Sequence, residues 1–428
     1  ALLEPSGHPV TAGAARRIID RGSPTRRVVI LGSTGSVGTQ AVDAVAHLND
    51  LHEQGRFPHR YEVVGLAAGS NGAVLAEQAE RLDVPRCALA HDPQDHARSI
   101  SGGGRSVRVG PDAAESIVRE THGGTGCDLV LGAIVGAAGL DSVLSALELG
   151  IDVALANKET LVAAGSIVIP AARASGARIL PVDSEHAGVW QCLMQAMGPG
   201  FAPPDPVSGD IARIVLTASG GAFRDYSPEQ VAHATPDQAL AHPTWDMGAK
   251  VTVDTATLVN KALELIEAHW LFGIGADRLD AVIHPTSTVH AMVEMGDGTV
   301  VAQMGATDMR TPILRAIAHP HRSPTPITPM DPTRLGGLEF RPIEGGWRRA
   351  IDLGMWAMRS EGDAGAVFNA SNEVAVNAFL EGRIPFGKIL DIVESVCGSH
   401  TVRPLLSVGD VRRADREARA RAKALLPD

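Results

Sequence analysis

Short apolar runs alternate with amphipathic segments between residues 26 and 180. The runs are rich in aliphatic residues and read, in order, VVILG, YEVVGLAAG, CALAH, CDLVLGAIVG and IDVALAN. The segments between them, such as QAVDAVAHL, repeat apolar residues at the spacing of a helix. Because strands that alternate with helices are typical of a parallel sheet covered by helices, we predict a Rossmann-like α/β domain at residues 26–180.

The pattern changes after residue 180. Strand-like runs follow at ARILPVD, ARIVLTAS and DRLDAVIHPTSTVHAMVEMGDGTVVAQMG, and the last run carries Gly296, Asp297 and Gly298 at its centre, which is a good hairpin signal. Between the second and third runs, DTATLVNKALELIEAHWLF has the apolar period of a single helix. We therefore predict a mixed α+β domain at residues 181–318.

Proline and then helical periodicity mark the rest of the chain. The stretch HPHRSPTPITPMDPTRLGG is rich in proline, which removes hydrogen-bond donors and favours an extended chain, so residues 319–344 are predicted to be a linker. The segments WRRAIDLGMWAM, SNEVAVNAFLEG and VRRADREARARAKALL predict a helical C-terminal domain at residues 345–428. Residues 1–25 lack either pattern, and we expect a flexible arm there.

Composition excludes several classes of protein. With 428 residues and 44% hydrophobic residues, the chain can form more than one large core. The net charge is -11 and there is no basic block, which argues against a nucleic-acid partner. Apolar runs of about 18 residues, the length that spans a membrane, do not occur. The four cysteines are far apart and lack zinc-ligand spacing, so we expect a cytoplasmic protein without a structural zinc.

The glycine-rich stretch GSTGSVG lies between the first strand and the first helix. Glycines at 32, 35 and 38 allow a tight turn in which backbone N–H groups approach a phosphate at a helix N-terminus. The next strand ends in Gly69, Ser70 and Asn71, where NAD-specific folds usually place an acidic residue, and this favours NADP. The stretch ALANKET places residues 157–159 at the end of a later strand, on the edge where such sheets bind ligands.

Two acidic residues flank a serine in VDSEH, directly after a predicted strand. If the extended geometry continued, Asp183 and Glu185 would point to one side and Ser184 to the other. Two such carboxylates repel each other unless a cation or a shared proton lies between them. Oxygen ligands suit Mg²⁺ or Mn²⁺, but by itself the motif is also compatible with a helix cap or a turn.

A third acidic residue is available in the helix predicted after residue 253. Its period turns Val259 and Leu263 towards the core and leaves Asn260, Lys261 and Glu264 together on the opposite stripe. Taken alone, such a lysine and glutamate pair is usually a solvated surface feature. Together with VDSEH, Glu264 could complete a carboxylate metal site.

Two further stretches indicate a substrate site. TASGGAFR places Ser219 before two glycines, in a turn suited to an anion. AHPTWDMGAK places His242, Trp245 and Met247 in a loop, where exposed apolar side chains favour a lid that closes over a substrate. The alternative is that Trp245 and Met247 pack beneath a neighbouring strand.

These motifs occur in an order that resembles the 1-deoxy-D-xylulose 5-phosphate reductoisomerase family. The shared motifs are LGSTGSVGTQ, ALANKET, PVDSEH, TASGGAFR, HPTWDMG, NKALELIEAHWLFG, IHPTSTVHAMV, DMRTPI and FNASNEVAVNAFL. The resemblance implies an NADPH-binding domain, a central catalytic domain with a flexible flap and a helical C-terminal domain. It also implies NADPH-dependent conversion of 1-deoxy-D-xylulose 5-phosphate to 2-C-methyl-D-erythritol 4-phosphate for isoprenoid synthesis, with Mg²⁺ or Mn²⁺, in a homodimer.

The resemblance also implies a role for individual residues. The metal ligands, which are catalytic, would be Asp183, Glu185 and Glu264. Lys158 would be a further catalytic residue. The substrate would contact Lys158, Ser184, Glu185, Ser219, His242, Thr255, Asn260, Lys261 and Glu264. The flap would carry Trp245 and Met247. NADPH would contact Thr34, Gly35, Ser36, Val37, Gly69, Ser70, Asn71, Asn157, Glu159 and Gly248.

Two other interpretations remain open from the sequence. An NADP-dependent dehydrogenase of the aspartate-semialdehyde type also uses a glycine-rich loop of this kind, but it needs a reactive cysteine with a histidine partner. Cys192 lies in a helical apolar run and Cys127 opens a strand, so neither fits that role well. The second alternative is a non-catalytic NADP-binding sensor, which would have little need for three converging acidic residues.

Overall fold

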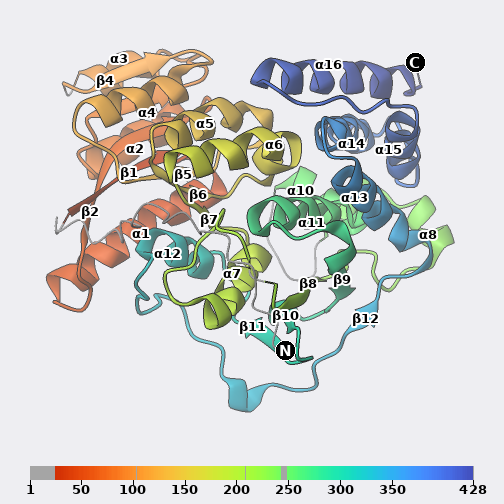
Figure 1. Ribbon diagram of the computed structural model, residues 1–428. Coiled ribbons are helices and arrows are strands. Elements are labelled where there is room, and N and C mark those ends of the chain that lie inside the picture. Colours follow the sequence, from red (N-terminus) through yellow and green to blue (C-terminus); the bar gives the residue numbers. More distant parts are fainter. Residues whose placement is uncertain (1–24, 103, 208, 242–247, 428) are drawn as a thin grey trace, which may run out of the picture.

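The computed structural model describes residues 25–102, 104–207, 209–241 and 248–427 (Figure 1). The predicted arm, apart from Thr25, lies outside these residues. The predicted lid residues His242, Trp245 and Met247 lie outside them as well.

The first half of the chain is built around a parallel sheet. Within the described residues its strands are ordered β4 (Ser106–Val109), β3 (Arg86–Leu89), β2 (Arg60–Ala68), β1 (Thr25–Leu31), β5 (Leu129–Gly132), β6 (Asp152–Leu155) and β7 (Ile179–Pro181). Every neighbouring pair is parallel. The central strand β1 is buried from Val28 to Leu31, as a strand covered on both faces must be. The predicted Rossmann-like α/β arrangement is confirmed.

Helices connect these strands and cover both faces of the sheet. They are α1 (Ser36–Glu53), α2 (Gly72–Arg81), α3 (His96–Ser101), α4 (Ala113–Gly123), η1 (Gly136–Gly139), α5 (Leu140–Glu148) and α6 (Lys158–Ser175). Strand β7 crosses the predicted domain boundary at residue 180. It is the edge strand of the first sheet, paired with β6 through Val153 and Ile179.

A second, mixed sheet follows. Its strands are ordered β11 (Val300–Met304), β10 (Val289–Met295), β8 (Ile211–Ala218), β9 (Leu279–Ile283) and β12 (Arg341–Pro342). The predicted hairpin joins β10 to β11, with Gly298 at a φ of +84°. The proline-rich segment is not only a linker, because its end forms β12 and pairs with β9.

Further helices surround this sheet. They are α7 (Ser184–Met197), α8 (Pro228–Ala232), α9 (Pro236–Leu240), α10 (Ala249–Thr257), α11 (Val259–Phe272), η2 (Ala276–Arg278) and α12 (Arg310–Ala318). Helix α7 packs on β10, whereas α12 reaches back to α1 of the first half. The two halves therefore share one continuous core.

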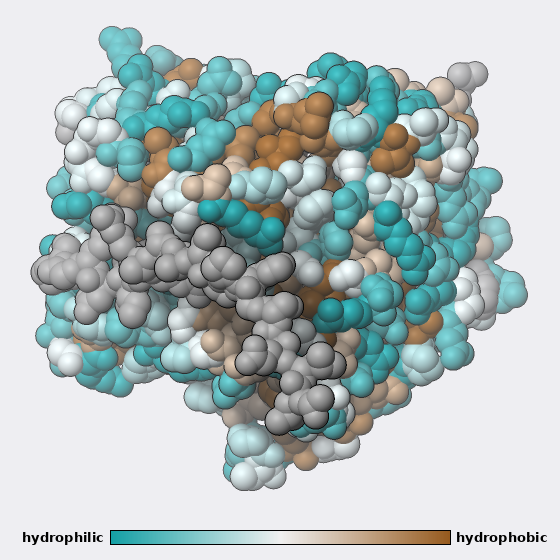
Figure 2. Space-filling view, in the orientation of Figure 1, coloured by the Kyte–Doolittle hydropathy of each residue, from teal (hydrophilic) through white to brown (hydrophobic). Residues whose placement is uncertain are grey.

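Helices form the C-terminal part, as predicted. They are η3 (Pro332–Arg334), η4 (Gly345–Trp347), α13 (Arg348–Ser360), α14 (Ala364–Leu380), α15 (Lys388–Gly398) and α16 (Val408–Ala424). Helix α14 packs against α6 and α16, and α13 against α11. In Figure 2 hydrophobic residues gather near the place where the helices of the first sheet meet these C-terminal helices. In the part of the chain described here, no helix has both the length and the apolar character needed to cross a membrane.

Candidate active site

The glycine-rich loop lies at the carboxyl edge of the parallel sheet. Gly32 ends β1 with a φ of +81°, and a Cβ atom there would lie 2.5 Å from the carbonyl oxygen of Ala133. Only glycine permits this close approach between the loop after β1 and the loop after β5. Helix α1 then begins after Gly35, whose position at the N-cap leaves backbone N–H groups available for a phosphate.

Asn71 and Asn157, two other predicted cofactor residues, lie at the same edge, after β2 and β6. Asn71 caps α2, because its side-chain oxygen accepts a hydrogen bond from the N–H of Val74 at 3.3 Å. Asn157 caps α6 by accepting from the N–H of Thr160 at 3.2 Å, and its amide donates to the carbonyl of Gly136 at 2.8 Å. The side chain of Asn157 therefore fixes the loop after β5 in place.

The motif VDSEH leaves the strand immediately. Asp183 is the N-cap of α7, and its carboxylate accepts a hydrogen bond from the N–H of Glu185 at 3.3 Å. The condition under which Ser184 would point away from the two acidic residues is not met, because the helix begins at Ser184. Its hydroxyl instead donates to Glu185 Oε2 at 2.5 Å.

The helix that supplies the third acid is interrupted. The single predicted helix is two helices, α10 and α11, separated by Leu258 with a φ of +62°. A buried, branched residue in this left-handed conformation is strained, and such strain often lies at functional sites. The alternative that Lys261 and Glu264 form a solvated surface pair is excluded, since Lys261 is 3% exposed and Glu264 is 1% exposed.

Asp183, Glu185 and Glu264 converge. One carboxylate oxygen from each lies within 4.8 Å of the others. The ammonium group of Lys158 lies 2.9 Å from Asp183 Oδ2 and 3.1 Å from Glu264 Oε1. Lys261 lies 2.7 Å from Glu185 Oε1 and also contacts Glu264. Three carboxylates thus share two ammonium groups, in a place that is largely closed to solvent.

The local charges shift the pKa of these groups in opposite directions. Burial and the charge of Glu264 raise the pKa of Glu185 to about 7, although Lys261 lies beside it. Burial would raise the pKa of Asp183 as well, but Lys158 and His186 hold it well below its usual range. Burial opposes the charge on Lys158, yet Asp183 and Glu264 hold the pKa of Lys158 well above its ordinary value.

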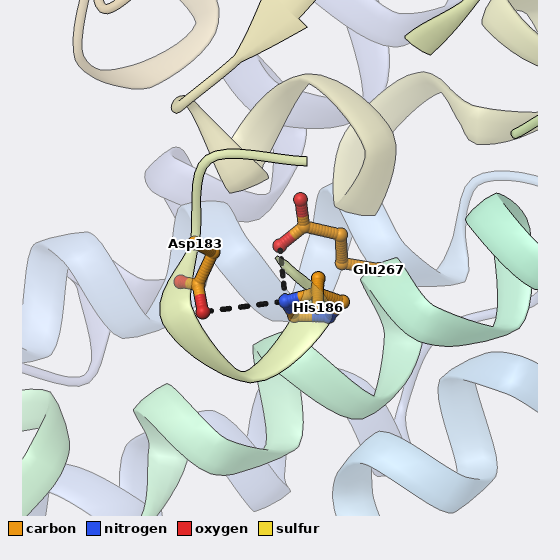
Figure 3. A group of neighbouring side chains, drawn as sticks. All are labelled: Asp183, His186 and Glu267. Carbon is orange, nitrogen blue, oxygen red and sulfur yellow. Dashed lines mark ion pairs between the residues drawn. The ribbon is translucent and has the colours of Figure 1, made fainter. Parts of the chain in front are cut away.

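A second group of side chains adjoins the first. His186 Nδ1 lies 3.3 Å from Asp183 Oδ1 and 3.6 Å from Glu267 Oε2 (Figure 3). His186 Nε2 lies 2.8 Å from the carbonyl oxygen of Glu264, so this nitrogen donates. Burial would lower the pKa of His186, but Glu267 and Asp183 raise it to about 9. The imidazolium therefore links the start of α7 to α11, the two helices that carry the converging carboxylates.

The predicted phosphate residues come from the turn after β8 and from helices α10 and α11. Gly221 has a φ of +68°, and a Cβ atom there would lie 2.7 Å from the carbonyl oxygen of Thr255, so the turn after Ser219 packs directly on α10. Arg224 Nη1 donates to the carbonyl oxygen of Ser219 at 3.2 Å and holds this turn. Asn260 instead accepts a hydrogen bond from Lys158 at 2.8 Å, beside the carboxylates.

Comparison with known proteins places the chain in a family. Its residues 28–165 match the family model for 1-deoxy-D-xylulose 5-phosphate reductoisomerase, residues 179–272 match the model for the C-terminal domain of that enzyme, and residues 304–421 match a model for the DXP reductoisomerase C-terminal domain. The reductoisomerase from Bordetella avium is 42% identical over 407 residues, which are 93% of this chain and 98% of the relative. This chain belongs to the 1-deoxy-D-xylulose 5-phosphate reductoisomerase family.

Solved structures of the family have the same fold. The reductoisomerase from Zymomonas mobilis, in complex with NADPH, is 38% identical and superposes with a TM-score of 0.83, covering 94% of this chain and 99% of that one. A second reductoisomerase, in complex with NADPH, fosmidomycin and magnesium, is 34% identical with a TM-score of 0.82, covering 93% of this chain and 98% of that one. The resemblance expected from the motifs is confirmed.

The structure does not support the dehydrogenase alternative, which needs a reactive cysteine as its nucleophile. All four cysteines are buried and free. Burial raises the pKa of Cys192 and of Cys127 to about 12, so both thiols stay protonated at neutral pH.

Sequence reasoning missed three members of this region. His186 was read only as part of the motif, and Glu267 and Lys250 were not assigned. A signal was present, because His186 follows Asp183 by three positions and Glu267 follows Glu264 by three, which is the spacing of neighbours on one helix face. Lys250 precedes Asp254 by four positions, which is a second such spacing.

Proposed function

We propose that this chain converts 1-deoxy-D-xylulose 5-phosphate to 2-C-methyl-D-erythritol 4-phosphate, with NADPH as reductant and Mg²⁺ or Mn²⁺ as metal. The observation that carries the proposal is the convergence of Asp183, Glu185 and Glu264 next to the nucleotide-binding edge of the sheet. In this proposal residues 26–180 hold NADPH, residues 181–318 hold metal and substrate, and residues 345–428 support both.

The three converging carboxylates of Asp183, Glu185 and Glu264 suit a divalent cation. Their donors are all oxygen atoms and the mutual distances of these atoms suit a single ion. Burial, followed by the charge of Glu264, raises the pKa of Glu185, and a bound cation would offset both effects. A bound Mg²⁺ or Mn²⁺ would polarise the ketone of the substrate and stabilise negative charge on its oxygen atoms. Asp183, Glu185 and Glu264 would be its ligands, and His186 would orient Asp183 through their contact.

The remaining side chains would bind and orient the sugar phosphate. Ser219 and Thr255, brought together by the packing of the turn on α10, would hold the phosphate together with Asn260 and Lys261. Ser184 and His242 would contact the rest of the substrate, and Trp245 and Met247 would exclude water above it. Lys158 would stabilise an oxyanion or carry a proton, since its ammonium group already lies between Asp183 and Glu264.

NADPH would supply the hydride for the reduction. We propose that it lies along the carboxyl edge of the parallel sheet. The residues that would hold it are Thr34, Gly35, Ser36, Val37, Gly69, Ser70, Asn71, Asn157, Glu159 and Gly248. We further propose, following the resemblance, that the protein works as a homodimer in the cytoplasm in isoprenoid synthesis.

The test is loss of NADPH absorbance when 1-deoxy-D-xylulose 5-phosphate is added, with Mg²⁺ and after removal of metal by a chelator. We expect oxidation only with metal and substrate together. Thiol alkylation should leave the rate unchanged, which separates this activity from that of a cysteine-dependent dehydrogenase. Absence of oxidation under every condition would overturn the proposal and favour a non-catalytic NADP-binding protein.

A further inference from the structure

A buried charge cluster lies beside the active site and outside the metal group. Lys250 is in the first turn of α10, and its ammonium group lies 2.8 Å from Asp254 Oδ2, one turn later, and 3.6 Å from Glu159 Oε1 on α6. The Lys250 side chain is 21% exposed, whereas those of Asp254 and Glu159 are 1% and 8% exposed. One partly buried cation therefore lies between two acidic residues from different helices.

The cluster also reaches the C-terminal helices. The side-chain amide of Asn372, on α14, donates to Asp254 Oδ1 at 2.8 Å, and Asn372 is fully buried. Both carboxylate oxygens of Asp254 therefore have a partner. Oδ2 lies beside Lys250 on the same helix, and Oδ1 accepts from Asn372 on α14. The cluster connects α6, α10 and α14.

Both acidic partners of Lys250 adjoin residues of the proposed site. Glu159 follows Lys158, which contacts Asp183 and Glu264, and it lies two positions after Asn157, which fixes the loop after β5. Asp254 precedes Thr255, where the turn after Ser219 packs on the helix. Lys250 therefore connects two helices of the proposed site. Its ammonium group lies between Glu159, near the start of α6 on the cofactor side, and Asp254, on α10 next to the phosphate residue Thr255.

A surface helix pair would not have this geometry. A lysine and an aspartate four positions apart on an exposed helix stabilise it by only about 0.2–0.5 kcal/mol. Here Asp254 is buried and Lys250 is partly buried, and a second acidic residue approaches from another helix. Burial opposes the charge on Lys250, but Asp254 and Glu159 raise its pKa, so the ammonium group stays charged.

We propose that Lys250 is a positioning residue for the cofactor: its ammonium group holds the Glu159 carboxylate in place and neutralises the Glu159 and Asp254 charges at the edge where NADPH binds. Without it, two buried carboxylates face the same space without a cation, and they repel each other and any phosphate nearby. This inference rests on the proposed NADPH-dependent function and adds to it a residue that touches neither metal nor substrate.

The experiment compares K250M, K250R and N372A in the full-length protein. NADPH affinity is measured by fluorescence titration without substrate, and thermal unfolding and the KM for 1-deoxy-D-xylulose 5-phosphate are measured in parallel. We expect K250M to weaken NADPH binding by about tenfold, as loss of a coupled charge contact typically does, and to change the substrate KM less. K250R keeps the charge and should recover most of the affinity.

N372A is the matched control for a merely structural role. It removes the contact of Asp254 with α14 but leaves Lys250 and Glu159 in place, so it should lower the melting temperature and leave NADPH affinity within about twofold. Equal loss of affinity in K250M and N372A would overturn the proposal, and so would wild-type affinity in K250M. If K250M does not fold, K250Q removes the charge with retention of hydrogen-bond donors, and the same titration decides.

The outcomes separate this inference from the proposed function. If wild-type protein neither binds NADPH nor oxidises it with substrate, the proposed function is wrong and the role of Lys250 falls with it. If wild-type protein binds and oxidises NADPH while K250M binds it equally well, only the role of Lys250 is wrong.

Discussion

The carboxylate of Asp363 and the carboxylates around Asp183 are both buried, but their partners differ. Asp363, before α14, is 1% exposed. It accepts hydrogen bonds from His400 Nε2 at 2.7 Å, from the N–H of Arg403 at 2.8 Å and from Arg403 Nε at 3.2 Å. His400 Nδ1 in turn accepts from Arg421 at 3.2 Å. No buried side-chain polar atom of this cluster lacks a hydrogen bond, so the cluster is complete without a ligand.

The Asp183 cluster is not balanced in this way. Asp183, Glu185 and Glu264 share two ammonium groups, and His186 Nδ1 and Glu267 Oε2 are buried without a well-oriented hydrogen bond. Crowded like charges and incompletely bonded polar atoms cost free energy of folding. The comparison indicates that the Asp363 cluster serves stability, whereas the Asp183 cluster has the excess negative charge that a bound cation would compensate.

The largest effect is expected for D183N. Asparagine caps helices as well as aspartate does, so the start of α7 should persist, whereas the loss of a charged metal ligand should lower kcat about 1,000-fold, or roughly 4 kcal/mol. The melting temperature without metal should fall somewhat, because the neutral amide loses the charge interactions of Asp183 with Lys158 and His186.

The same variant has a readout that does not depend on turnover. Mg²⁺ should raise the melting temperature of the wild-type protein, by an amount equivalent to about 2.7 kcal/mol at a concentration 100 times the Kd, and should have little effect on D183N. Wild-type turnover of D183N at saturating Mg²⁺ would show that Asp183 does not hold the metal.

Sequence reasoning predicted the parts of the fold that follow from local patterns. The strands of the parallel sheet other than β4, the hairpin at Gly298 and the C-terminal helices each have a period or a turn signal within a short window. The short edge strand β4 was not predicted. The break at Leu258 could not be predicted this way, because a leucine in the left-handed conformation is imposed by tertiary packing and not by its own preference. Strand β12 also depends on a distant partner, β9.

The candidate site was predicted in a similarly uneven way. Asp183, Glu185 and Glu264 were proposed as one group from residue type, motif and family resemblance, and the structure brings them together. The solvated alternative for Lys261 and Glu264 could not be excluded from the sequence, because an amphipathic period cannot show that a polar stripe faces another domain. His186 and Lys250 each contact a residue on another helix as well as one near in sequence, and spacing along one helix can reveal only the nearby contact.

A smaller effect, of the opposite kind, is expected for D363A. The variant leaves the buried N–H groups of His400 and Arg403 without their acceptor, which should lower the free energy of unfolding by about 3 kcal/mol. The kcat measured well below the melting temperature should stay near that of the wild type. Chemical denaturation and steady-state kinetics check both statements, and a stability equal to that of the wild type would show that the two clusters do not differ as argued.

The smallest effect concerns pH. It separates the contribution of the negative charge of Asp363 to stability from the contribution of the size and hydrogen bonds of its side chain. Burial would raise the pKa of Asp363, but the hydrogen bonds from His400 and Arg403 hold it below its usual value of 3.8. Because the folded protein binds this proton less tightly than the unfolded chain, the stabilisation is complete above the unfolded pKa of 3.8. It is lost as the pH falls from there through the lower pKa of the folded protein. D363N keeps an acceptor oxygen but has no proton to bind. The difference in unfolding free energy between wild type and D363N should therefore be constant from about pH 8 to pH 5 and should shrink below about pH 4. Denaturant titrations followed by circular dichroism measure it, and a difference that stays constant down to pH 3 would show that the Asp363 charge contributes no stability.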